Sequence, residues 1–173
     1  HALGFNIRQY HMNEGHSALL TLELLRRHTY AQDELRPGEC PYDIPKVREL
    51  CNFTTHTPVE AGHDKFAYDV VQRTMGDFID QPTLKTLAGT DVLNMTCLAL
   101  NLSDYVNGVA KRHAEVSQKL YPGYRVHAIT NGVHPFTWTH PSFANLYDTH
   151  LPGWCHEPGI LVRADSMPDA AIW

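Results

Sequence analysis

The residues best suited to chemistry are a histidine that ends a threonine-rich run and two asparagine–glycine pairs. His56 lies near the end of the β-prone run 52–57, where its ring or its carbonyl could bind a hydroxyl such as that of a sugar. Asn131 precedes Gly132, and a glycine permits positive φ and close approach of a ligand. The Asn131 amide offers a donor and an acceptor together, which suits a sugar diol or a hydroxymethyl group.

Each of these signals has a simpler interpretation. His56 could be a hydrogen-bonded core histidine, and Asn131–Gly132 could be an ordinary turn. Asn107–Gly108 repeats the pattern just before a predicted helix, whose first N–H groups could face an anion. Spacing alone favours the simpler interpretation at all three places, so the residues by themselves leave the ligand open.

The 12 histidines of the chain are numerous enough to suggest a metal site. His11, Glu14 and His16 form His-x-x-Glu-x-His. The zinc metalloprotease helix needs its histidines one turn apart on one face, whereas these two lie five residues apart. We therefore expect no bound metal. The loop carboxylates of Glu60 and Asp104 form no acid–base pair by spacing, and solvated charges are the simpler interpretation.

Composition limits the class of protein. The chain has 173 residues, 43% hydrophobic and 19% charged, which is typical of one folded domain. A net charge of -5 without a basic cluster argues against a nucleic-acid partner. No apolar run approaches the roughly 20 residues of a membrane span, and no signal peptide is found. The four scattered cysteines predict reduced thiols, and we expect a cytoplasmic protein.

Helical and strand patterns alternate along residues 13–130. Apolar spacing predicts a helix over 13–28 that Asn13 caps, with Glu14 in its first turn and Ala18, Leu19, Leu22 and Leu25 on one face. The remaining predictions are a loop over 33–45, helices over 45–50, 66–79, 92–102 and 109–120, another beginning at 80–82, and strands over 52–57, 104–106 and 125–130. This order predicts a parallel α/β layer, in which ligands bind at the carboxyl ends of the strands.

The last segment has a different character. Tryptophans and prolines alternate from Pro135 onward, which favours a linker or a segment that covers another domain, not a core. We therefore divide the chain into 1–134, part of a Rossmann-like domain, and 135–173, a linker or crossover. The chain starts without Met and stops at Trp173, so we expect a piece of a longer protein.

Four segments in order resemble the α-glucan (glycogen) phosphorylase family, in its shorter bacterial and archaeal type. They are Tyr10-His11-Met12-Asn13-Glu14-Gly15-His16-Ser17-Ala18, Phe53-Thr54-Thr55-His56-Thr57, residues 92–113 with Val106-Asn107-Gly108-Val109-Ala110 inside them, and Ile129-Thr130-Asn131-Gly132-Val133 with Trp138 after it. The resemblance covers most of residues 10–140. It implies the GT-B arrangement of two Rossmann-like domains, with the active site between them.

The resemblance also implies residue roles. His56 would be the active-site histidine that contacts the 6-hydroxyl of the transferred glucose, and Asn131 would contact hydroxyls of the same sugar. Glu14 and His16 would support the pocket from behind. Glu14 stands where the better-known branch of the family has Asp, and Thr55 stands where it has Asn.

The reaction implied by the resemblance is reversible phosphorolysis of an α-1,4-glucan or maltodextrin by phosphate, giving glucose 1-phosphate with retention. Pyridoxal phosphate would be bound to a lysine in a carboxyl-terminal domain outside this chain, so we expect no cofactor bound here. The fragment alone is expected to be inactive, and a homo-oligomer of the parent stays open. The alternatives are a GT-B nucleotide-sugar glucosyltransferase, similar to glycogen synthase, and a non-catalytic carbohydrate-binding module built on the aromatic tail.

Overall fold

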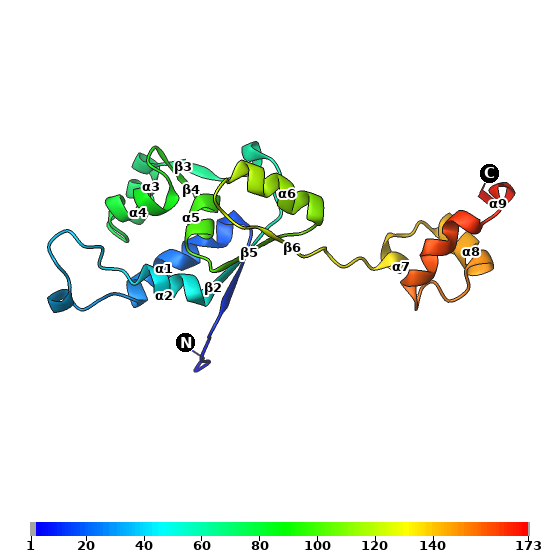
Figure 1. The fold of residues 1–173 in the computed structure, drawn as a ribbon, viewed down its shortest axis with the longest axis horizontal. Helices are drawn as coiled ribbons and strands as arrows, with labels where there is room; N and C mark the ends of the chain where they lie inside the picture. The colour runs from blue at the N-terminus through cyan, green and yellow to red at the C-terminus, as the bar shows by residue number, and fades with distance from the viewer. Residues whose placement is uncertain (1–2, 173) are drawn as a thin grey trace. The chain divides into compact units, whose positions relative to one another are not determined.

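The computed structural model describes residues 3–172, and the chain divides into two units, residues 1–130 and 131–173. The first unit is built on a four-stranded sheet, with strands β1 (Tyr10–Asn13), β2 (Cys51–Thr55), β5 (Tyr105–Gly108) and β6 (His127–Ala128). The strands lie in the order β1-β2-β5-β6, and every pair is parallel (Figure 1). The predicted α/β class with a parallel sheet is therefore confirmed.

Apolar side chains near the centre of β1, β2 and β5 set the register of the sheet. Met12 pairs with Phe53, and Phe53 pairs with Val106. All three side chains are buried. Burial of such a row on adjacent strands fixes the register, because a shift by one residue would turn apolar side chains to the other face.

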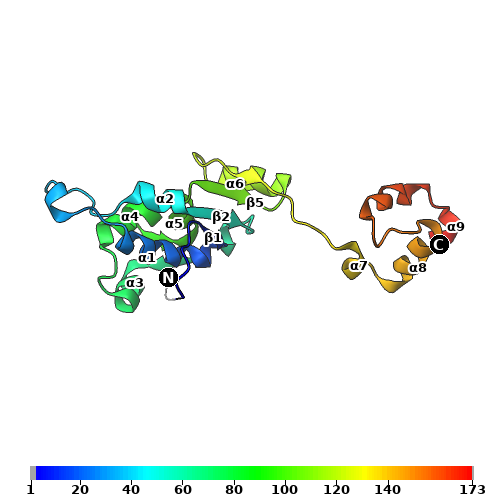
Figure 2. The ribbon, with the colours of Figure 1, turned by 90° about the horizontal axis from the view of Figure 1, so that it is seen from below.

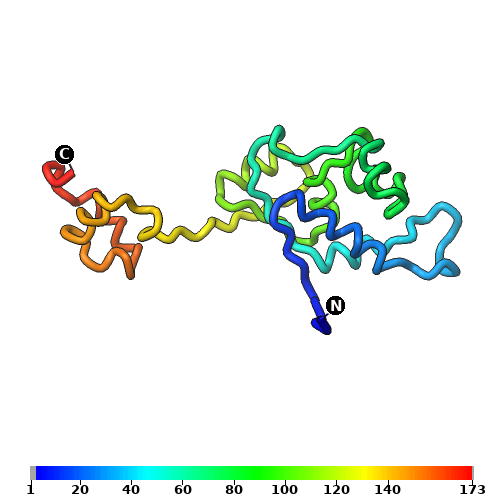
Figure 3. The backbone as a smooth tube through the Cα atoms, turned by 180° about the vertical axis from the view of Figure 1, so that it is seen from behind, coloured from blue at the N-terminus to red at the C-terminus, as the bar shows by residue number. Residues whose placement is uncertain are grey.

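Helices connect the strands, and three of the six described in this unit begin at a side-chain cap. They are α1 (Leu19–Arg27), α2 (Ile44–Leu50), α3 (Tyr68–Met75), α4 (Gln81–Ala88), α5 (Met95–Asn101) and α6 (Lys111–Leu120). Asp43, Asp80 and Asn94 each accept a hydrogen bond from a backbone N–H at the start of α2, α4 and α5. Figure 2 shows α6 alongside β5, and residues 29–43 form a loop that extends from the ends of α1 and α2 (Figure 3).

The predicted helix over 13–28 begins later than expected. Asn13 is the last residue of β1 and pairs with Thr54, so it caps no helix. Glu14 has φ 68 and ψ 163, a conformation that no helix contains. A 3₁₀ turn, η1 (Gly15–Ala18), then leads into α1. The predicted apolar face is correct for Ala18, Leu22 and Leu25, but Leu19 is 47% exposed.

A small antiparallel pair replaces parts of two predicted helices. Strand β3 (Lys65–Ala67) pairs with β4 (Val92–Asn94), so α3 begins at Tyr68 instead of residue 66, and α5 begins at Met95 instead of residue 92. The markers Phe66 and Val70 are exposed, because the buried side of α3 carries Tyr68 and Val71 instead. A strand of three residues shows too few alternating side chains to be distinguished from a helix by its hydrophobic period.

Asn107–Gly108 was predicted as a turn, and this prediction is wrong. Both residues belong to β5, where Asn107 pairs with Thr54 and Gly108 pairs with Thr55. The predicted strand over 125–130 is shorter, because only His127 and Ala128 pair with β5.

The second unit consists of short helices, namely α7 (Pro135–Trp138), α8 (Pro141–His150), η4 (Pro158–Ser166) and α9 (Asp169–Ile172). Trp154 is completely buried, its ring contacts Tyr147, and its indole N–H donates to Asp148 at 2.9 Å. The unit therefore has a small core of its own, which the sequence pattern did not predict. Trp138 is 79% exposed, and Trp173 lies outside the described residues. The role of this unit as a crossover stays a prediction.

Residues 3–172 contain neither a candidate membrane span nor a candidate metal site. None of the helices there is long and apolar enough to cross a membrane. No group of three or more His, Cys, Asp or Glu side chains in this part of the chain is arranged to hold a metal ion.

Candidate functional site

The polar residues of interest gather where the parallel strands end. Asn13 is the last residue of β1, and Glu14 follows it. Thr55 is the last residue of β2, and His56 follows it. Gly108 is the last residue of β5. The Gly108 carbonyl accepts a hydrogen bond from the backbone N–H of Ile129, just beyond β6, at 3.0 Å. Ligands of parallel α/β sheets bind at this carboxyl edge, so the candidate site lies here.

Glu14 clamps the chain that follows β2. Its backbone N–H donates to the Thr54 carbonyl at 2.9 Å. Its carboxylate accepts a hydrogen bond from the backbone N–H of His56 at 2.8 Å and another from the hydroxyl of Thr57. Glu14 is also the one non-glycine residue with positive φ among the described residues. Such a conformation costs on the order of 1–3 kcal/mol and is typical of functional sites.

The clamp works best when Glu14 is ionised. Burial by itself would raise the pKa of the carboxyl group, because it disfavours the charged form. The hydrogen bonds from Thr57 and from the amide of His56 outweigh burial, and the pKa of Glu14 lies below its ordinary value of 4.5. Glu14 is therefore a carboxylate at neutral pH, and it holds the turn by accepting hydrogen bonds.

The lowered pKa predicts a pH-dependent contribution to stability. Because the pKa of Glu14 is lower in the folded state, the contribution is complete above the unfolded value and is lost as the pH falls through the folded value. Urea unfolding of the wild type and of Glu14→Gln between pH 7 and pH 3 measures it. We expect the difference in free energy of unfolding to shrink below about pH 4.5. Glu115→Gln controls for the lost charge, and a difference that stays constant with pH contradicts the prediction.

His56 presents an exposed ring beside Asn13. Its Nε2 lies 2.6 Å from Oδ1 of Asn13, so the ring is held against the end of β1. The backbone of the same residue is held by Glu14. Asn13, the last residue of β1, and Glu14, which follows it, thus fix His56 just after β2, while the ring stays exposed to solvent.

A chain of polar contacts joins three strand ends behind this histidine. Nε2 of His11 lies 2.7 Å from the hydroxyl oxygen of Thr54, and this hydroxyl donates to Oδ1 of Asn107 at 2.9 Å. The amide of Asn107 donates to the carbonyl of Gly108 at 3.3 Å. Since Thr54 and Asn107 are buried, these contacts satisfy polar groups that would otherwise be costly to bury.

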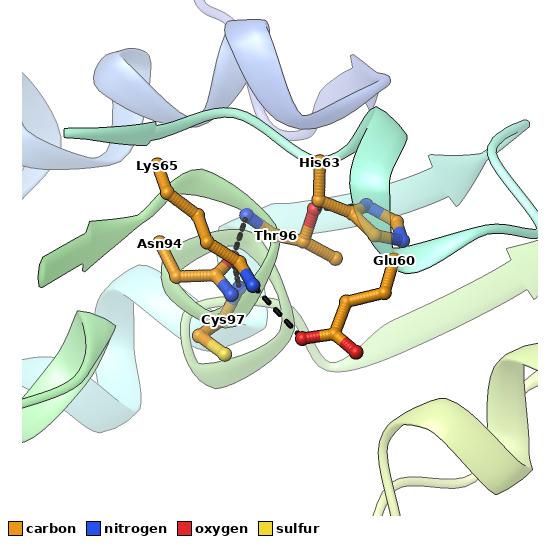
Figure 4. A network of polar contacts seen from close by, with 6 residues as sticks. All are labelled: Glu60, His63, Lys65, Asn94, Thr96 and Cys97. Carbon is orange, nitrogen blue, oxygen red and sulfur yellow. Dashed lines mark hydrogen bonds and ion pairs between the residues drawn. The ribbon is translucent and has the colours of Figure 1, made fainter.

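The loop after His56 is anchored at its far end by a second group of contacts (Figure 4). Lys65 forms an ion pair with Glu60 at 3.0 Å, and Nδ1 of His63 lies 2.8 Å from the hydroxyl oxygen of Thr96. His63 is buried, and desolvation lowers its pKa, which keeps its ring neutral. This group attaches the loop to the start of α5, and its exposed charges, Lys65 and Glu60, neutralise each other in an ion pair, so we interpret it as structural support.

The sequence of the chain is similar to that of several known proteins. No family model matches the chain. A maltodextrin phosphorylase of Thermococcus litoralis is 31% identical over 188 aligned residues, covering 99% of this chain and 22% of that protein. A glycogen phosphorylase of Mycobacterium tuberculosis is 30% identical over 95% of this chain and 21% of its own length. A glycogen phosphorylase of Aquifex aeolicus is 29% identical over 86% of this chain and 23% of its own length.

The chain is homologous to a segment of the maltodextrin and glycogen phosphorylases. It spans about a fifth of the length of these relatives. The family resemblance inferred from the four sequence segments is therefore confirmed.

The predicted site residues of this phosphorylase homologue lie in different places. Glu14 and His56 are in direct contact through the backbone of His56. His16 is exposed in η1 and makes no hydrogen bond within residues 3–172. Asn131 is the first residue of the second unit and is exposed, so the site described here consists of first-unit residues. The sugar contacts assigned to His56 and Asn131 and the supporting roles assigned to Glu14 and His16 stay predictions.

The sequence interpretation of the phosphorylase homologue missed Asn13 as a site residue. Asn13 was assigned to a helix cap, although it lies at the end of a strand beside His56. The available signal was the β-prone triplet Tyr10–Met12 directly before it, too short to outweigh the strong helical pattern that follows. Thr57 was also missed, since its hydroxyl acts only through contact with Glu14.

Proposed function

We propose that this chain forms part of the glucose-binding wall of an α-glucan phosphorylase, a glycosyltransferase that converts glucan and phosphate to glucose 1-phosphate. The observation that carries the proposal is the exposed ring of His56, which Asn13 and Glu14 hold at the carboxyl edge of the parallel sheet. Similarity to maltodextrin and glycogen phosphorylases along the chain supports it. A glucan and phosphate are the proposed substrates of the parent protein.

In the proposed role, His56 contacts the 6-hydroxyl of the transferred glucose and Asn131 contacts hydroxyls of the same sugar. Glu14 sets the position of His56, and His16 supports the pocket. Each neutral hydrogen bond to a hydroxyl contributes only about 0.5–1.5 kcal/mol net. Several together fix the glucosyl ring for attack by phosphate, and such orientation supplies much of an enzyme's rate enhancement.

The proposed family cofactor, pyridoxal phosphate, does not fit the site in this chain. The groups that converge at the strand ends are the carboxylate of Glu14, the ring of His56, and the neutral side chains of Asn13 and Thr57. A carboxylate at this position repels a phosphate group, whereas neutral donors and acceptors suit sugar hydroxyls. We assign the cofactor to a part of the parent outside this chain and derive no step through it.

The proposed domain arrangement follows the same logic. Residues 1–134 form part of the first Rossmann-like domain of a GT-B enzyme, and residues 135–173 form the crossover toward the second. The isolated chain is then inactive, since the groups that act on phosphate belong to the other domain. A homo-oligomer of the parent is compatible with this arrangement.

The test measures the activity of the parent protein that contains this chain. We expect glucose 1-phosphate to form from maltodextrin and phosphate, and His56→Ala to lower kcat/KM about tenfold, the effect of one lost hydrogen bond at its upper range. His156→Ala removes an exposed histidine without a side-chain hydrogen bond among the described residues and is the control. Transfer from a nucleotide sugar without any phosphorolysis would identify a glucosyltransferase instead.

A separate titration examines the carbohydrate-binding module. The isolated chain is titrated with maltodextrin while tryptophan fluorescence is followed, because Trp138 is largely exposed. We expect no saturable change. Tight binding that Trp138→Ala abolishes would favour a binding module over the proposed enzyme fragment.

A further inference from the structure

The contact between His56 and Asn13 determines which nitrogen of the imidazole ring carries the proton. Nε2 of His56 lies 2.6 Å from Oδ1 of Asn13. An amide oxygen can only accept a hydrogen bond, so Nε2 must be the donor. A neutral imidazole has one N–H, and Nδ1 is therefore left with its lone pair. Within residues 3–172, Nδ1 of His56 makes no hydrogen bond, and the ring is exposed.

We propose that Asn13 is a positioning residue that fixes the Nε2–H tautomer of His56, so that Nδ1 of His56 accepts a hydrogen bond from a substrate hydroxyl. The selectivity is then for a group that donates, since an acceptor in the same place would meet a lone pair. The assignment of the hydroxyl to a glucan rests on the proposed function, whereas the tautomer rests on the geometry alone.

The placement of Asn13 makes this role effective. Asn13 is the last residue of β1 and pairs with Thr54, two residues before His56. The next residue, Glu14, accepts the hydrogen bond from the backbone N–H of His56. Two consecutive residues thus hold both the backbone and the ring, which leaves the ring little freedom to turn. Glu14 is the charged side chain that acts electrostatically on His56, and its carboxylate is held by Thr57.

Asn13 and Glu14 consequently have different roles toward His56. Glu14 fixes the position of the His56 backbone, and Asn13 determines which ring nitrogen of His56 presents its lone pair to the ligand. Loss of Asn13 would leave His56 in place but free to populate both tautomers. This separates a positioning role from a merely structural one, because the fold and the tautomer can be measured independently.

Nitrogen NMR of the ¹⁵N-histidine-labelled chain tests the tautomer directly. The spectra are recorded at pH 8, and two-bond correlations distinguish the protonated nitrogen of a neutral imidazole from the unprotonated one. His56→Gln identifies the signals of this residue. We expect Nε2–H in the wild type, Nε2–H retained in Asn13→Asp, which keeps an acceptor oxygen, and a mixture in Asn13→Ala. Asn52→Ala, on the neighbouring strand, should leave the signals unchanged. A protonated Nδ1 in the wild type overturns the proposal.

The parent protein tests the consequence for substrate selection. In the direction of glucan synthesis, it is assayed with glucose 1-phosphate and with its 6-deoxy and 6-deoxy-6-fluoro analogues. Fluorine can accept but cannot donate, so we expect the wild type to discriminate against both analogues by about 2- to 10-fold, the effect of one neutral hydrogen bond. In Asn13→Ala this discrimination should weaken, and in Asn13→Asp it should be retained at pH 8.

The two experiments separate the two proposals. A parent without activity on glucose 1-phosphate contradicts the proposed function, while the NMR result still decides the tautomer. Preference for the fluoro analogue over the deoxy analogue would show that Nδ1 donates, and it would overturn the role assigned to Asn13. Equal discrimination by the wild type and Asn13→Ala would overturn it as well.

Discussion

Replacing Glu14 with alanine is expected to lower glucose 1-phosphate formation by the parent about tenfold, the effect expected of His56→Ala, because Glu14 acts through the position of His56. The physical reason is that one carboxylate holds both the backbone N–H of His56 and the hydroxyl of Thr57. Without it the turn after β2 loses both of these hydrogen bonds, and the backbone of His56 is no longer held. The loss should appear mainly in kcat, because the misplaced ring affects orientation more than encounter with substrate.

Glu14→Gly is the matched variant, because it also removes the carboxylate but tolerates the backbone conformation. Glu14 has φ 68 and ψ 163, which favours glycine. We expect both variants to lose activity equally. The glycine variant should be more stable than the alanine variant by about 1 kcal/mol, the relief of backbone strain less the extra entropy of an unfolded glycine. Urea unfolding measures this, and an alanine variant as stable as the glycine variant would show that the conformation carries no strain.

Gly108→Ala is expected to destabilise the first unit by about 1–3 kcal/mol, the usual cost of overfilling a packed site. A Cβ at this position would lie 2.4 Å from Nδ1 of His113 and 3.2 Å from the backbone nitrogen of Ala114. The ring of His113 is buried and α6 packs on β5, so neither group can move aside cheaply. Denaturant unfolding measures the cost, and Gly159→Ala, where a Cβ meets open space, is the control.

A double-mutant cycle identifies the cause of the Gly108 effect. His113→Ala removes the ring that the added Cβ would contact. We expect Gly108→Ala to cost at least about 1 kcal/mol less in the His113→Ala background than in the wild type, since residues in contact couple by about 0.5–3 kcal/mol. Equal costs in both backgrounds would mean that the strain comes from the backbone of α6 and not from the histidine ring.

Three of the four strands of the parallel sheet could be predicted from the sequence because they contain β-prone or apolar runs that end near turn-forming residues, whereas β1 (Tyr10–Asn13) was not predicted. Residues 51–55 and 105–108 form strands close to the predicted places. The helix predicted over 109–120 is also present, since an apolar stripe with period 3.6 survives in almost any packing. The boundaries failed where three-residue strands, such as Lys65–Ala67 and Val92–Asn94, carry too few residues to show a period.

The candidate site divides in the same way. The sequence by itself determined the α/β class, His56 and Glu14 as candidates, and the order of four segments that identifies the phosphorylase relatives. Only the tertiary structure decided that Asn13 lies beside His56, that Asn107 is part of a strand, and that Glu14 has positive φ. The first two facts depend on the pairing of β1 with β2 and of β2 with β5, whose paired residues are about 40 and about 50 positions apart in the chain. Local pattern reports only neighbours within one element, whereas a hydrogen bond between strand ends depends on which strands become adjacent when the core is buried.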